Sequence, residues 1–242
     1  MWVSAETWWP TRLPNDATEP GMPTRFATSD STNPIWDAMR HRVAVDGSAG
    51  HVMVARLLGP NGAQRDMADA IHTLGMVHGR HPGLADEALA QGVQPQATPW
   101  LGAVAAAFAD ERAYLAALVS AAGPIPSTPG QAETEAALVG QYHALHMLAG
   151  SSRAGCATGA VIAQMLDWAA IRAVLDHAAG RFGLNVAPLT FPGSDKTAIL
   201  TGLLAETAGS ERAMRFGADQ LLAQHRGLWD LIEARASARD HG

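Results

Sequence analysis

The chain of 242 residues carries 17 basic and 23 acidic side chains, and its formal net charge of −6 excludes the basic face that nucleic-acid binding requires. A single cysteine, Cys156, excludes an intramolecular disulfide framework and a multi-thiolate zinc site. Charged residues make up only 17% of the chain, against a norm of about 25%, which predicts extensive burial in the fold or against a partner.

The N-terminus has neither the basic start nor the apolar run of a secretory signal. Two charge-free stretches, 88–109 and 113–132, are interrupted by prolines together with glutamines or glycines. Neither is a convincing bilayer span, which needs about 20 mostly apolar residues. We therefore expect a cytoplasmic protein that binds no membrane.

Residues 1–33 differ in composition from the rest of the chain. Four prolines prevent a regular helix or central strand, and three tryptophans each have a large apolar surface to bury: Pro10, Pro14, Pro20, Pro23, Trp2, Trp8 and Trp9. The pattern predicts an extended arm, 1–33. The arm is expected either to pack on its own bundle or to wrap a neighbouring subunit of a homo-oligomer.

From residue 34 onward the pattern is helical. Hydrophobic periodicity, helix caps and Gly/Pro breaks predict helices at about 34–46, 49–58, 63–79, 84–90, 99–122, 132–149, 154–181, 194–207 and 211–239. No segment shows the sustained period-two alternation of a strand. The fold class is therefore predicted as all-α, with residues 34–242 forming a single helical bundle of about five long and several short helices.

The predicted helices 132–149 and 154–181 are expected in the middle of the bundle. Between Ala136 and Leu166 the only charged residue is Arg153, and a helix without a charged face is buried all round. Gly155 and Gly159 are four residues apart, a spacing that lets a neighbouring backbone approach closely. The alternative is that this bare backbone lies against a flat ligand.

Two polar residues interrupt apolar helical stripes. Glu111 lies in the stripe of the helix 99–122, and His225 lies in the stripe of the last helix. A carboxylate in such a position has to be paired, bound to metal or protonated.

Further histidines are also candidates for burial. His143 and His146 share nearly one face of an uncharged helix, so they have no polar face to which they can turn. His78 lies in the apolar row of the helix 63–79. On the same helix Asp69 and His72 are spaced as a carboxylate–imidazole pair, but their face looks polar.

Together these residues form a candidate ligand set. Imidazole and carboxylate groups suit iron, zinc, copper or manganese, so iron or a haem is one reading, and an organic ligand in a core cavity is another. Asp69-x-x-His72 only approximates the Glu-x-x-His pair of two-metal bundles. In the third reading no ligand is needed, because Glu111 pairs with a buried arginine, such as Arg153 or Arg172, or with one of the histidines.

The glycine- and serine-bearing segment Gly150-Ser151 through Gly155 and Gly159 resembles the kinked distal helix of haem-oxygenase-like bundles. The resemblance implies that His41 stands where such proteins carry an early proximal histidine. It covers only a few dozen residues, and the surrounding pattern does not follow that family, so no family is assigned.

Three functional hypotheses remain. The first is a helical-bundle protein with a core metal, haem or small-ligand site, including an oxidoreductase. The second is a non-catalytic interaction or structural subunit that docks through its N-terminal arm and apolar surface. The third is a regulator that senses a small molecule in the bundle cavity. The sequence assigns no catalytic residue and leaves open whether the protein is an enzyme.

Overall fold

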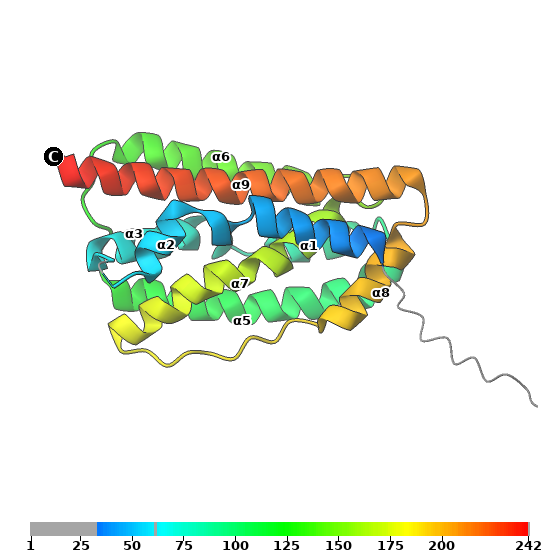
Figure 1. The fold of residues 1–242 in the computed structure, drawn as a ribbon, viewed down its shortest axis with the longest axis horizontal. Coiled ribbons are helices and arrows are strands. Elements are labelled where there is room, and N and C mark those ends of the chain that lie inside the picture. Colours follow the sequence, from blue (N-terminus) through cyan, green and yellow to red (C-terminus); the bar gives the residue numbers. More distant parts are fainter. Residues whose placement is uncertain (1–32, 61, 242) are drawn as a thin grey trace, which may run out of the picture. The chain divides into compact units, whose positions relative to one another are not determined.

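The computed structural model describes residues 33–60 and 62–241. The predicted arm, with its three tryptophans, lies outside the described residues except for Asn33. The described residues contain α-helices and short 3-10 helices and no strand, which confirms the all-α class (Figure 1). The helices are α1 (Pro34–Asp46), η1 (Ser48–Gly50), α2 (Val52–Leu58), α3 (Gln64–His78), α4 (Leu84–Gln91), η2 (Pro95–Ala97), α5 (Thr98–Ala122), α6 (Gln131–Ala149), α7 (Cys156–Phe182), α8 (Ser194–Leu204) and α9 (Ala208–His241).

The helix ends follow from local sequence. Asn33 caps α1 by accepting a hydrogen bond from the backbone N–H of Trp36, and Pro34 occupies the first turn, where a missing N–H costs nothing. Pro99 likewise lies in the first turn of α5. That helix ends at Ala122, and the next residue, Gly123, has a φ of 75°. Such a backbone conformation favours glycine because it has no Cβ.

Helix α7 is the centre of the bundle. It packs against α1 to α6 and against α9, and most of its residues are buried. By length and composition it is the one helix among the described residues that could cross a membrane, but 78% of that apolar window is buried within the fold. This burial is typical of the core helix of a bundle.

The prediction that the helix 132–149 also lies in the middle was wrong. Helix α6 packs against α3, α4, α7 and α9 on one side only. Val139 and Met147 are 54% and 62% exposed. The charges of α6, Glu133 and Glu135, lie near its N-terminus, and the rest of this surface helix resembles a buried one in sequence because alanine is tolerated in both places.

The small-residue row predicted at Gly155 and Gly159 lies against helix α9. A Cβ on Gly159 would lie 2.2 Å from the carbonyl oxygen of Met214, and one on Gly217 would lie 2.0 Å from that of Cys156. Real Cβ atoms do not approach so closely, so the two backbones touch at this crossing only because both helices carry glycine. The close-packing interpretation is therefore confirmed.

Candidate functional site

Glu111 is buried among groups that satisfy its charge. The Trp168 indole donates a hydrogen bond of 2.8 Å to Oε2, and the Arg172 guanidinium pairs with Oε1. Arg172 also donates to Asp176. Glu111 is therefore engaged by an arginine, one of the alternatives that the sequence left open, and it does not join the histidines.

Asp69 is buried rather than on a polar face, so that prediction was wrong. It is 1% exposed and accepts hydrogen bonds of 2.7 Å from Arg235 and from Arg239. Its supposed partner His72 lies at the surface side of α3, with Nε2 2.8 Å from the Gly123 carbonyl oxygen. The two residues do not form a pair because the arginines of α9 occupy the carboxylate.

His143 and His146 are exposed, contrary to the prediction that they have no polar face. The error has the same cause as the misplacement of α6, since both follow from taking a surface helix for a buried one. Nδ1 of His146 lies 2.6 Å from Oε1 of Glu87 on α4. The two histidines therefore do not form a buried ligand pair, although His146 lines a small cavity together with His78.

His225 is buried as its place in the α9 stripe predicted, and it is held by a carboxylate. Its Nδ1 lies 2.6 Å from Oδ2 of Asp167 on α7. Asp167 also accepts from the Ser48 backbone N–H at 2.7 Å and from the Ser48 hydroxyl at 2.5 Å. Gly47 permits this approach, because a Cβ there would lie 2.5 Å from Oδ1 of Asp167.

These contacts fix the charge on Asp167 and the proton on His225. Burial alone would raise the pKa of Asp167, but the hydrogen bonds from His225 and Ser48 outweigh it, so the pKa lies below its usual value. An ionised carboxylate can only accept, so Nδ1 of His225 donates its proton to Asp167. In the neutral ring, Nε2 of His225 then presents a lone pair.

His78 is the second buried imidazole, and the structure places it beside His225. The ring centroids lie 5.0 Å apart in an edge-to-face arrangement. Burial lowers the pKa of His78 well below its ordinary value, and the neighbouring His225 acts in the same direction. Nε2 of each ring is buried without a hydrogen-bond partner among the described residues.

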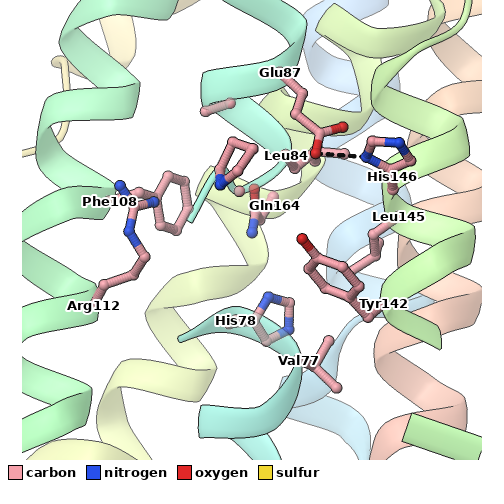
Figure 2. A pocket seen from close by; sticks show the side chains of 13 residues that line it. Val77, His78, Leu84, Glu87, Phe108, Arg112, Tyr142, Leu145, His146 and Gln164 are labelled. Atoms are coloured by element: carbon pink, nitrogen blue, oxygen red, sulfur yellow. Dashed lines mark hydrogen bonds and ion pairs between the residues drawn. The ribbon is translucent and has the colours of Figure 1, made fainter. Parts of the chain in front are cut away.

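A small cavity adjoins His78. It has a volume of about 20 Å³ and lies among residues of α3, α4, α5, α6 and α7. Figure 2 shows His78, Tyr142 and Gln164 around the same space, with the Glu87–His146 pair at its side. Oε1 of Gln164 is also buried without a partner in the described part of the chain. This volume accommodates a water molecule or a single ion.

Sequence reasoning missed Asp167 and Gln164. One signal was available, because Asp167 is the first acidic residue after the stretch from Ala136 to Leu166, which contains no carboxylate. Its position one residue before Trp168 on a largely buried helix should have marked it as a carboxylate in need of a partner.

A cluster of one histidine and two acidic residues lies at the surface. His51, Asp230 and Glu233 have donor atoms within 4.8 Å of one another. However, Nδ1 of His51 accepts the backbone N–H of Met53, and Nε2 lies 3.0 Å from Oδ1 of Asp230. A neutral ring that accepts at Nδ1 carries its proton on Nε2. His51 is thus engaged as a helix cap that donates to Asp230.

A family model describes most of this bundle. The model of a family of unknown function, DUF6975, matches residues 43–240. The chain belongs to this family. No curated protein and no solved structure matches it.

The resemblance to haem-oxygenase-like bundles gains no support. His41 is exposed, and the segment 150–155 connects two helices instead of bending one.

Proposed function

We propose that this DUF6975 protein binds one transition-metal ion through Nε2 of His78 and Nε2 of His225. The observation that carries the proposal is the pair of buried, unpartnered imidazole nitrogens on adjacent rings. Each unsatisfied buried polar atom costs about 1–3 kcal/mol. A bound ion would remove this cost at both nitrogens at once.

The Asp167–His225 hydrogen bond supports a metal role. Histidines that bind metals usually donate their other ring N–H to a carboxylate or carbonyl, which fixes the tautomer and makes the ligand nitrogen more basic. Asp167 does this for His225 at 2.6 Å. The low pKa of His78 keeps the second imidazole neutral near pH 7, so the ligand need not lose a proton.

The spacing of the rings also fits. An ion about 2.0–2.1 Å from a ring nitrogen lies roughly 3.2 Å from that ring's centroid, so two tetrahedral ligands place their centroids about 5 Å apart. The observed distance is 5.0 Å. Two imidazoles favour zinc, copper, iron or nickel and leave other coordination positions for Gln164 or water.

The cavity beside His78, which His225 does not line, is too small for the larger ligands considered from the sequence. A space of about 20 Å³ is far smaller than the roughly 300–1,000 Å³ of organic-ligand pockets. A haem or an organic metabolite would need a rearrangement of five helices.

The test is metal stoichiometry in the full chain. Protein stripped with a chelator and dialysed against Zn²⁺ should retain one ion per chain by elemental analysis. His78→Gln and His225→Gln should each weaken binding by at least about tenfold, the effect typical of disturbing metal ligands and their supports. Co²⁺ in place of Zn²⁺ should give visible absorption bands that are altered in both variants.

Two control variants separate the buried pair from other histidines. His143→Gln removes an exposed imidazole of α6 and should leave binding unchanged. His51→Gln removes the exposed cluster. Retention of the ion by His225→Gln with its loss in His51→Gln would overturn the proposal, as would the absence of any ion in folded wild-type protein.

A further inference from the structure

An apolar groove lies between the N-terminal part of α5 and helix α8. It has a volume of about 720 Å³ and is lined mainly by Pro99, Trp100, Phe191, Ile199, Leu200 and Leu203. Ile199 and Leu203, four residues apart on α8, are 67% and 56% exposed. Large apolar side chains exposed together around a concave surface indicate a binding site.

Two polar side chains of the groove wall, those of Trp100 and Thr190, are hydrogen-bonded within the protein. The Trp100 indole N–H donates to the Thr197 hydroxyl at 3.2 Å, so the ring presents an apolar face to the groove. The Thr190 hydroxyl donates to Asp110 at 3.3 Å. A ligand in the groove should therefore gain most of its binding affinity from apolar contacts.

Lys196 is the only charged residue among those that line the groove. No carboxylate of residues 33–60 or 62–241 lies within salt-bridge distance of its ammonium. Within the described part of the chain, the groove thus combines one cation without an ion-pair partner and an extended apolar wall. This pattern is complementary to an amphipathic anion with one negative group.

We propose that the groove binds a long-chain carboxylic acid. The carboxylate pairs with the Lys196 ammonium, and the hydrocarbon chain lies against Trp100, Ile199 and Leu203. A volume of about 720 Å³ is within the range of small-molecule pockets, roughly 300–1,000 Å³, and accommodates such a chain. The site is separate from the buried histidines and does not depend on a metal ion.

The experiment is displacement of fluorescent cis-parinaric acid from the full chain by oleate or by methyl oleate, below micellar concentrations. Oleate should bind about fivefold more tightly than its uncharged ester, because an exposed ion pair contributes up to about 1 kcal/mol. Lys196→Gln should abolish this preference. Ile199→Asp and Leu203→Asp should weaken oleate binding by at least about tenfold, since each places a charge against the chain.

Matched variants outside the groove test its specificity. Arg212→Gln removes an exposed positive charge, and Met147→Asp adds a negative charge at an exposed apolar position of α6, so both should bind oleate as the wild type does. Equal affinity for oleate and its ester, or unchanged oleate binding in Lys196→Gln, would overturn the proposal. A dimer that dissociates in Ile199→Asp, without oleate binding to the wild type, would instead assign the groove to a second copy of the chain.

Discussion

Two buried polar regions of this bundle differ in how they are satisfied. At one end, Asp66 and Asp69 of α3 are surrounded by the guanidinium groups of Arg56, Arg235 and Arg239. Near the middle, His78 and His225 each keep a ring nitrogen without a partner among the described residues. In the first region the ion pairs account for the buried charges, whereas in the second the two ring nitrogens are the atoms to which we assign a metal ion.

The difference teaches that burial of a polar residue is not evidence of a site. Asp69 is as buried as His225, at 1% exposure, and both come from positions that sequence analysis selected as candidates. What separates them is the set of neighbours. The hydroxyls of Thr128 and Thr134 also accept hydrogen bonds from Arg235, so its guanidinium has partners besides Asp69.

Breaking the arginine–aspartate region should have the largest effect. Asp69→Ala leaves the buried guanidinium of Arg235 without its carboxylate, and removal of one partner of a buried pair costs about 3–5 kcal/mol. Urea denaturation should show this loss. The control is Arg226→Ala, whose pair with Asp46 is exposed and should contribute less than about 1 kcal/mol. Equal losses in both variants would show that the buried cluster is not structural.

Lowering the pH should destabilise the fold through His78. The folded pKa of His78 lies well below 6.5, so below pH 6.5 the unfolded chain binds a proton at His78 that the folded chain does not. The free energy of unfolding should therefore decrease as the pH is lowered below 6.5, by up to about 1.4 kcal/mol per pH unit from this group. The measurement is the stability of metal-free wild type from pH 7 to pH 5, relative to His78→Leu.

The variant removes that group, so the difference between the two stability curves isolates His78. Asp167 does not contribute in this window, because its depressed pKa means that its stabilisation is lost only as pH falls below its ordinary acidic range. Parallel curves for wild type and His78→Leu would contradict a neutral, buried His78.

Replacing His78 in metal-free protein should have the smallest effect on the free energy of unfolding. Without metal, His78→Leu at pH 7.5 should change stability by less than about 1 kcal/mol, because the lost Nε2 has no hydrogen bond to give up and the apolar group avoids its desolvation. With saturating Zn²⁺, only the wild type should gain stability. A loss above about 2 kcal/mol in metal-free protein would indicate that His78 has a structural partner.

Much of the architecture could be predicted from the sequence. Pro34, Pro99 and the glycine breaks placed most helices near their observed bounds, because caps and breakers act locally. The burial of His78 and His225 followed from their places in apolar stripes. The positions of His143 and His146 did not follow, since the charges of α6 lie only near its N-terminus and the sequence marks no face of the remaining helix as exposed.

The sequence by itself determined that this chain is an all-α bundle and that histidines enter its core, and it left close backbone packing or a flat ligand as the alternatives at Gly159. Only the tertiary structure decided the partners. Arg235 is 166 residues from Asp69, and His225 is 58 from Asp167. Such pairs form when helices pack, because helical periodicity specifies which face of a helix is buried but not which residue of another helix lies opposite.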